Sequence, residues 1–81
     1  MINVKIKCFS QVKYALGKNE LNLDLKTGTT SLELEKLIRK EADGKLDSVS
    51  LRVAVNQKYV TTETVLKDSD EVAFIPPVQG G

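Results

Sequence analysis

The stretch Thr30-Ser-Leu-Glu-Leu-Glu-Lys-Leu-Ile-Arg-Lys40 decides the fold of this 81-residue chain, because it supplies the helix that the rest must pack against. Thr30 and Glu33 match a capping box, in which each residue satisfies a backbone N–H of the first helical turn. Apolar residues then recur at helical spacing and predict one buried face: Leu34, Leu37 and Ile38. Asp43-Gly44 marks the end of the segment. The sequence therefore predicts one main helix.

Two segments of alternating polarity precede this helix. In residues 2–9 the apolar side chains fall on one face at every second position: Ile2, Val4, Ile6 and Cys8. Residues 21–25 alternate leucine with polar residues in the same way. Such alternation is typical of half-buried strands. Because residues 14–19 carry a glycine and an asparagine, we expect a short turn-bearing connection and an antiparallel hairpin.

Three more strand-like segments follow the helix. They are residues 51–55, the pair Tyr59-Val60 after the turn at 56–58, and residues 71–75 after the turn Asp68-Ser69-Asp70. The order is β-β-α-β-β-β, in which one main helix covers one face of a mixed sheet of four or five strands. This order resembles the α+β, ubiquitin-like β-grasp fold, in which the first and last strands lie parallel at the centre of the sheet. The crossover through the helix is right-handed by rule.

The composition excludes several classes of partner. The 12 basic residues oppose 11 acidic ones, whereas nucleic-acid binding needs a basic excess on one face. No apolar run reaches membrane-spanning length, and the first residues alternate like a strand rather than forming a signal-peptide core. Cys8 is the single cysteine, so no internal disulfide can form and a reducing compartment is expected. We expect a cytosolic protein with no nucleic-acid or membrane partner.

The chain offers little conventional catalytic chemistry. It has no histidine, so general base catalysis near neutral pH would need a strongly shifted group. It has no Cys/His cluster of metal-ligand spacing and no glycine-rich phosphate loop, so we expect no metal and no stably bound cofactor. Cys8 shares the inward face of the first strand and is expected to be a core residue rather than a reactive thiol.

The sheet face opposite the helix is the candidate interaction surface. Strand alternation predicts that four residues are exposed there, with Tyr59 beside them at a strand edge: Phe9, Ala54, Ala73 and Ile75. Such an apolar face favours docking on a partner. The alternative is scattered surface apolar residues with a register error of one position, which would turn every side chain to the other face.

The chain ends in Pro76-Pro77-Val78-Gln79-Gly80-Gly81. The prolines cannot extend a strand ladder and stiffen the exit, and the glycines lack Cβ and leave the terminal carboxylate unhindered. We therefore predict a folded domain over residues 1–75 and an extended tail over residues 76–81. The alternative is an ordinary frayed terminus.

The ending Glu71-Val-Ala-Phe-Ile-Pro-Pro-Val-Gln-Gly-Gly81 resembles the MoaD family of sulfur carriers, the small subunits of molybdopterin synthase. Residues 8–13, 54–60 and 66–72 agree with the family as well, so the resemblance covers the whole chain. There are two departures. Tyr14 stands where the family commonly has an acidic residue, and Ser69 stands where glycine is common. Serine there costs little unless the position needs a positive φ.

The resemblance implies a mechanism. An E1-like adenylyltransferase consumes ATP to adenylate the carboxylate of Gly81, and a sulfur donor, usually a persulfide, converts the adenylate to a thiocarboxylate. The large subunit of the synthase receives the inserted tail, Pro76, Pro77, Val78, Gln79 and Gly80, and completes the active site. There the thiocarboxylate donates sulfur to a cyclic pyranopterin precursor, and two such transfers build the molybdopterin dithiolene. Phe9, Tyr59 and Ile75 are the residues expected to bind the large subunit.

The family also implies that this chain is no enzyme on its own, and that two small and two large subunits form a heterotetramer. Three other functions remain open. Sulfur carriers for thiamine thiazole synthesis are usually shorter and lack Pro-Pro before the tail. Ubiquitin-like modifiers, including the dual-function carrier for tRNA thiolation, usually end in His-Gly-Gly. A β-grasp interaction domain with an inert tail would be a non-catalytic binding module.

Overall fold

The computed structural model describes residues 1–60 and 63–76 of the chain. These residues form two helices and five strands, listed here in chain order: β1 (Ile2–Cys8), α1 (Ser10–Leu16), β2 (Glu20–Leu25), α2 (Ser31–Glu41), β3 (Arg52–Val55), β4 (Lys58–Tyr59) and β5 (Glu71–Ile75). The strands belong to one mixed sheet, so the predicted α+β architecture is confirmed, with one helix more than expected. Neither of these two helices is long and apolar enough to cross a membrane.

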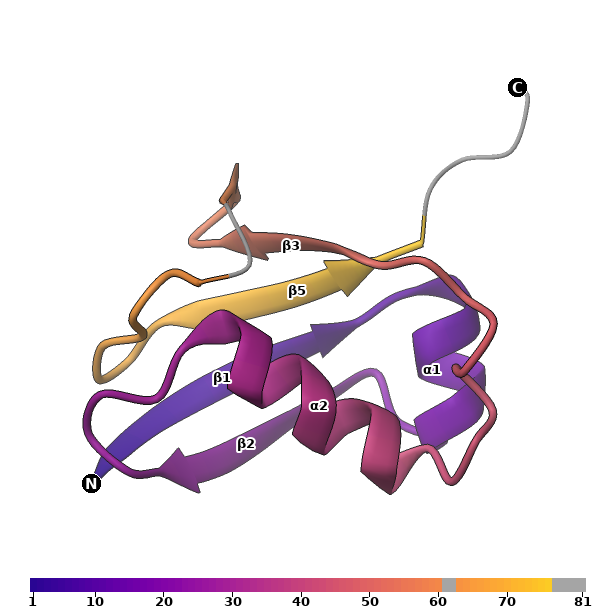
Figure 1. Ribbon diagram of the computed structural model, residues 1–81, viewed down its shortest axis with the longest axis horizontal. Helices are drawn as coiled ribbons and strands as arrows, with labels where there is room; N and C mark the ends of the chain where they lie inside the picture. Colours follow the sequence, from indigo (N-terminus) through magenta and orange to yellow (C-terminus); the bar gives the residue numbers. More distant parts are fainter. Residues whose placement is uncertain (61–62, 77–81) are drawn as a thin grey trace.

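The strand order β2-β1-β5-β3-β4 puts the first and last strands side by side at the centre of the sheet (Figure 1). β1 runs parallel to β5, with Ile6 opposite Val72, and antiparallel to β2, with Val4 opposite Leu23. Both predicted pairings are confirmed. The central strands supply fully buried side chains to the core: Val4, Ile6, Val72 and Phe74.

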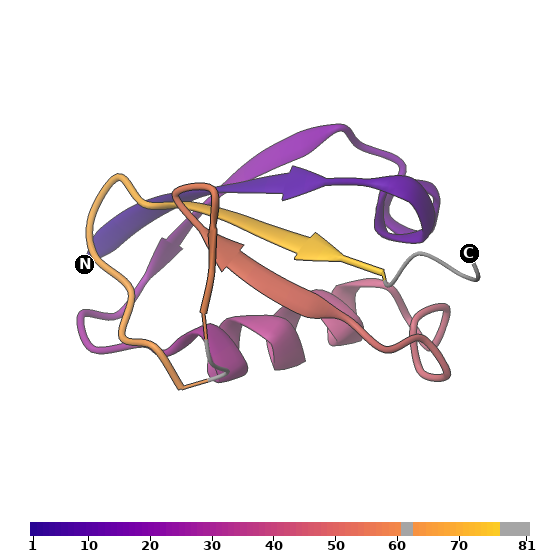
Figure 2. The same ribbon diagram turned by 90° about the horizontal axis from the view of Figure 1, so that it is seen from above.

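Helix α2 begins where the sequence predicted. The hydroxyl of Thr30 accepts a hydrogen bond from the Glu33 N–H at 3.2 Å, and the Glu33 carboxylate accepts one from the Thr30 N–H at 3.0 Å. The helix lies across one face of the sheet (Figure 2) and buries Leu34 and Ile38 completely. The prediction that Leu37 shares this buried face was wrong, because its side chain is 44% exposed. Leu37 lies at the margin of the apolar stripe rather than at its centre.

The short turn expected between the first two strands was also wrong, because residues 10–16 form helix α1. Its N-terminus at Phe9 has no side-chain cap, and Gly17 ends it with a left-handed φ of 71°. Val12 is the residue that α1 buries. Val12, Ala15 and Leu16 do fall at helical spacing, and Ala15 and Leu16 pack partly buried against the core. Three apolar residues in two turns are a weak signal, however, and the usual start signal is absent.

Five described residues other than glycine have left-handed backbone: Ser10, Asp43, Asn56, Gln57 and Ser69. In the two-residue loop between β3 and β4, Asn56 and Gln57 have φ of 52° and 70°, as a type I′ hairpin turn requires. In the turn before β5, the Asp70 N–H donates to the Lys67 carbonyl at 3.1 Å and Ser69 has φ of 70°. The position of Ser69 therefore does need a positive φ, so serine is strained where glycine would not be.

The segment between α2 and β3 is attached to the helix by Arg39. Its guanidinium lies 2.9 Å from the carboxylate of Glu35, and it donates to the carbonyl oxygens of Leu46 and Val49. Leu46 is itself completely buried. This connection fixes where β3 enters the sheet, and so helps to position the face opposite α2.

Candidate docking face and C-terminal tail

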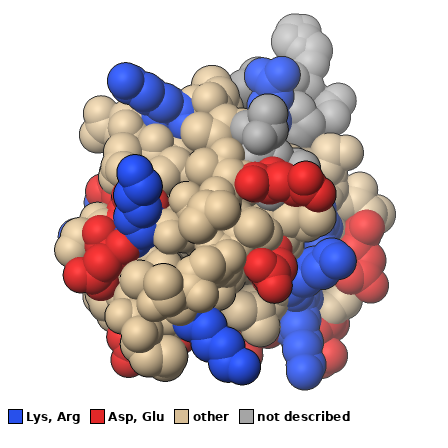
Figure 3. Space-filling model, turned by 60° about the vertical axis from the view of Figure 1, so that its left-hand side comes forward, with Lys and Arg blue, Asp and Glu red and all other residues tan. Residues whose placement is uncertain are grey.

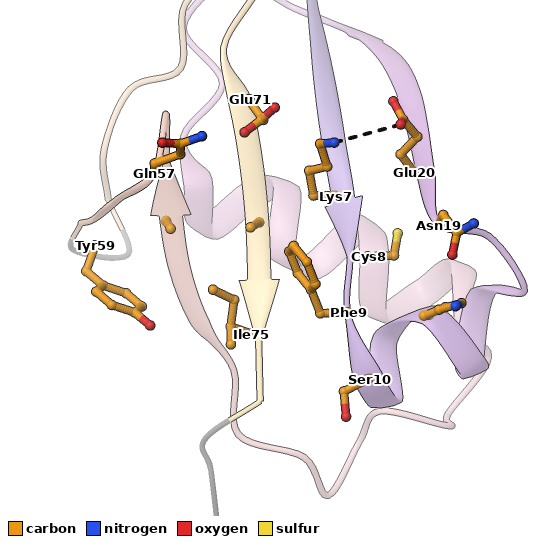
Figure 4. A pocket seen from close by; sticks show the side chains of 13 residues that line it. Lys7, Cys8, Phe9, Ser10, Asn19, Glu20, Gln57, Tyr59, Glu71 and Ile75 are labelled. Carbon is orange, nitrogen blue, oxygen red and sulfur yellow. Dashed lines mark ion pairs between the residues drawn. The ribbon is translucent and has the colours of Figure 1, made fainter.

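The sheet face opposite α2 carries a groove of about 680 Å³. Residues from all five strands and from α1 line it, so chain segments far apart in sequence meet there (Figure 4). Its apolar lining includes all five residues predicted for the docking face: Phe9, Ala54, Tyr59, Ala73 and Ile75. Phe9 is 47% exposed and Tyr59 is 64% exposed. We call this set of residues the docking groove.

Phe9 and Ile75 lie together because β1 and β5 are parallel. Cys8 is opposite Phe74 in that pair, so the residue after each emerges at the same end of the sheet. Figure 4 shows the two side chains next to each other at the end of β5. Pro76 follows Ile75 outside the strand and is buried. The chain thus leaves the sheet directly beside the apolar part of the docking groove.

Tyr59 forms the opposite wall of the groove from the edge strand β4. It is paired with Ala54, and the guanidinium carbon of Arg52 lies 5.4 Å from the centre of its ring. Such a cation–π contact helps to hold an exposed ring in place. Arg52 was not among the predicted site residues. The strand alternation that exposes Arg52 on the same face as Ala54 was the signal that could have found it.

The prediction that Ala54 is exposed was wrong, because its side chain is only 5% exposed. Ala54 lies between Ala73 on β5 and Tyr59 on β4, and the larger neighbours around these two alanines shield it. Ala73 and Ile75 are half-buried. The two alanines form a low floor between larger side chains, which is why this sheet face is hollowed rather than flat.

Charged side chains of both signs surround the apolar part of the groove. Glu20 lies 3.7 Å from the ammonium of Lys5 and 3.9 Å from that of Lys7. Figure 4 shows Lys7, Glu20 and Glu71 at the end of the groove away from the exit of the chain. Acidic and basic side chains are likewise intermixed over the side of the molecule in Figure 3. Exposed pairs of this kind add little stability but can select a complementary partner.

Cys8 is buried, as predicted from its place on the inward face of β1. Burial raises the pKa of its thiol above the ordinary value, the nearby Glu20 raises it further, and Lys18 opposes the change. The thiol is therefore protonated near neutral pH, and a protonated buried thiol is a poor nucleophile. The prediction of a core cysteine is confirmed.

The predicted tail falls largely outside the described residues. Pro77, Val78, Gln79, Gly80 and Gly81 are not among them, so their roles and the division into residues 1–75 and 76–81 stay predictions. Within residues 1–60 and 63–76, no three metal-ligating side chains are grouped to hold an ion.

Comparison with known proteins supports the resemblance found in the sequence. A molybdopterin synthase sulfur carrier subunit from Chlamydomonas reinhardtii is 37% identical, over 99% of this chain and 100% of that protein. The structure of a putative molybdopterin converting factor, subunit 1, from Pyrococcus furiosus matches with a TM-score of 0.87 at 28% identity, over 96% of this chain and 100% of that one. A chain in the complex of subunits 1 and 2 of molybdopterin-converting factor from Helicobacter pylori shares the fold, with a TM-score of 0.70 at 23% identity, over 99% of this chain and 100% of that one.

The family can be assigned from nearly the full length of the chain. The family model that matches covers residues 6–81, from the middle of β1 to the last glycine. The predicted resemblance to the MoaD-type carriers is confirmed by these matches. This chain belongs to the ThiS family.

Proposed function

We propose that this chain is the sulfur carrier subunit of molybdopterin synthase. The observation that carries the proposal is that the apolar docking groove lies directly beside the point where the chain leaves β5. A carrier must bind its partner firmly while its terminus enters the partner's active site, and this arrangement places both functions at one end of one face. The Chlamydomonas reinhardtii relative, which matches over its full length, carries this name.

Gly81 is the reacting residue in this proposal. Its carboxylate attacks the α-phosphate of ATP on an E1-like enzyme, which releases pyrophosphate and forms an acyl-adenylate. The terminal sulfur of a persulfide displaces AMP, and a thiol then cleaves the sulfur–sulfur bond to leave the thiocarboxylate. Six extended residues, 76–81, span at most about 20 Å, which is enough to enter a buried site. Gly80 keeps the tip slender because it lacks Cβ.

The large subunit supplies the remainder of the active site. In this proposal the groups that orient the pyranopterin and transfer protons come from the partner, since this chain has no histidine for proton transfer near neutral pH. The chain is therefore a sulfur donor within an enzyme complex rather than an enzyme alone. The Helicobacter pylori relative, whose structure is a complex of subunits 1 and 2, supports a large-subunit partner. A heterotetramer of two small and two large subunits in the cytosol remains part of the proposal.

Phe9, Ile75 and Tyr59 are the proposed contacts with the large subunit. Interface cores are enriched in aromatic side chains that fill pockets on the partner. The half-exposed rings of Phe9 and Tyr59 and the side chain of Ile75 surround a floor of small residues. This shape suits an apolar projection from the partner, with the charged end of the groove setting the orientation.

Mass spectrometry of the intact chain tests the sulfur-carrier function. After incubation with ATP, an E1-like enzyme and a persulfide donor, we expect one oxygen of the Gly81 carboxylate to be replaced by sulfur. A chain that lacks Gly81 should keep its fold and its binding to the large subunit but accept no sulfur. An isopeptide adduct on another protein would instead favour a ubiquitin-like modifier, and sulfur transfer by the truncated chain would contradict the role of Gly81.

Binding of the large subunit tests the docking groove. Burying one large apolar side chain contributes about 1.5–3 kcal/mol, so Phe9→Asp or Ile75→Asp should weaken binding by about 10- to 150-fold. Val65→Asp is the matched control, because Val65 is a 55% exposed apolar residue outside the groove. Isothermal titration calorimetry gives the three affinities. If the two groove variants bind as tightly as the control, the docking face lies elsewhere.

A further inference from the structure

The outer edge of β2 carries a second interaction surface. Within the described residues, β2 pairs only with β1 and ends the sheet on the side away from β3 and β4. The Cys8 N–H donates to the Asn19 carbonyl across this pair at 2.8 Å. Because hydrogen-bonded positions alternate in an antiparallel pair, Leu21, Leu23 and Leu25 bond to β1. The backbone N–H and C=O groups of Glu20, Asn22 and Asp24 therefore point outward, away from the sheet.

A half-exposed apolar band runs beside this edge. Leu21 and Leu23 are half-buried on the α2 side of the strand, and together with Leu16 they line a hollow of about 310 Å³. Glu41 of α2 borders the same hollow. Leu37, the leucine that is 44% exposed, lies one helical turn before Glu41 on the same side of α2. The edge thus combines outward-pointing backbone groups with leucines that the chain itself covers only in part.

The sequence of β2 is complementary to itself. In an antiparallel pairing of two copies centred on Leu23, each Asn22 faces the other copy's Asp24, and each Glu20 faces the other copy's Lys26. Leu23 then faces Leu23, and Leu21 faces Leu25. The outward backbone groups fall at Asn22 and Asp24, which is where this register needs hydrogen-bonded pairs. Shifting the register by two residues would instead set Glu20 against Asp24 and oppose like charges, which is unfavourable.

From this agreement we infer that two copies of the chain associate through β2, in antiparallel register about Leu23, and form one continuous sheet. Charged residues on an edge strand usually discourage pairing with other chains. Here they discourage most partners but match a second copy. The ladder is short, so the dimer is weak and depends on concentration.

β4, which carries Tyr59, lies at the opposite edge of the sheet, and the exit of the chain after Ile75 lies on the central strand β5. Dimerisation therefore leaves Tyr59 and the exit of the chain available to a partner, whereas Glu20, which lines the charged end of the groove, would also face the second copy.

Substitutions at Asn22 test the register, because this exposed residue faces Asp24 of the second copy. Sedimentation velocity of the full chain should show a monomer–dimer equilibrium. Asn22→Asp should weaken the dimer and Asn22→Lys should strengthen it, each by about 2- to 30-fold, since the symmetric contact occurs twice. Inside one copy Asn22 is paired with Lys5 on β1 and lies between Glu20 and Asp24 on the same face of β2. Thermal unfolding of each variant at low concentration is therefore the control for the fold.

Oxidative cross-linking tests the symmetry centre directly. The two Leu23 residues would form a non-hydrogen-bonded pair with Cα atoms about 4.5 Å apart, close enough for a disulfide. Leu23→Cys should therefore cross-link, whereas Leu21→Cys, displaced along the strand, should not; the buried Cys8 is common to both. A chain that stays monomeric up to about 1 mM overturns the proposal. The proposal is also overturned if the Asn22 variants leave the dissociation constant of the dimer unchanged, or if the Leu23→Cys and Leu21→Cys variants cross-link to the same extent.

Discussion

Replacing Arg39 tests how the chain positions the strand that follows α2. The guanidinium donates to Glu35 at 2.9 Å, to the carbonyl oxygen of Val49 at 2.8 Å and to that of Leu46. The side chain of Arg39 is 25% exposed and that of Glu35 is 14% exposed, so water screens these contacts only in part. Arg39→Ala removes all three contacts and leaves two carbonyl oxygens to find other donors.

A hydrogen bond to a charged group contributes about 1.5–3 kcal/mol, and the three contacts share one guanidinium, so their energies do not add. We expect Arg39→Ala to lower the free energy of unfolding by about 2–4 kcal/mol. That is a large part of the roughly 4–12 kcal/mol expected for a domain of this size. The melting temperature should fall by about 10–25 °C. Arg39→Lys keeps the charge but not the planar guanidinium, and should lower the free energy of unfolding by about half as much.

Urea denaturation followed by circular dichroism measures these differences. Lys36→Ala is the matched control, because Lys36 is an exposed basic residue of the same helix and should change stability by less than about 0.5 kcal/mol. Hydrogen exchange should also show faster opening of residues 42–50 in Arg39→Ala. If that variant is as stable as the Lys36→Ala control, the attachment of this segment to α2 is not what positions β3.

Two further predictions concern backbone strain and the buried thiol. Ser69→Gly should relieve a left-handed backbone and raise the free energy of unfolding by up to about 1 kcal/mol, after the greater unfolded-state entropy of glycine is deducted. The control is Ser50→Gly, at an exposed position without a positive φ, which should lower the free energy of unfolding by about 0.5–1 kcal/mol. If denaturant titrations give the same change for both glycine variants, Ser69 is not strained. Because the folded state raises the pKa of Cys8, its thiol binds a proton more tightly in the folded chain than in the unfolded one. This tighter proton binding stabilises the fold in full below the pKa of the unfolded thiol. The stabilisation declines as pH rises from that value through the pKa of the folded thiol. Stability should therefore fall in that alkaline window less steeply in Cys8→Ala than in the parent chain, and identical pH profiles would contradict this.

Most of the architecture could be predicted from local patterns. Two-residue alternation identified three strands to within a residue or two, the turns at 56–58 and 68–70 marked the other two, and the capping box at Thr30 located α2. The errors occurred where local pattern carries little information. In helix α1 the apolar repeat is limited to Val12, Ala15 and Leu16, and the exposure of Leu37 depends on how α2 packs on the sheet. The strain at Ser69 depends on its backbone φ, which cannot be read from the identity of the residue.

The candidate site shows the same division. The face assigned to Phe9, Tyr59 and Ile75 followed from alternation, and the groove they line confirms that they share it. Alternation did not predict that Ala54 would be buried, because its exposure depends on the neighbouring strands. The contact of Arg52 with the ring of Tyr59 likewise depends on which strands are paired.

By itself the sequence determined the order of the five strands and the place of the main helix among them, and it contains no histidine, because each is a property of residue identity or of neighbours along the chain. Only the tertiary structure decided that Phe9 and Ile75 meet at one end of the sheet, since they come from strands more than sixty residues apart. The physical reason is that a pattern specifies which face of a strand is buried, whereas the choice of neighbouring strand depends on how all elements together cover one core.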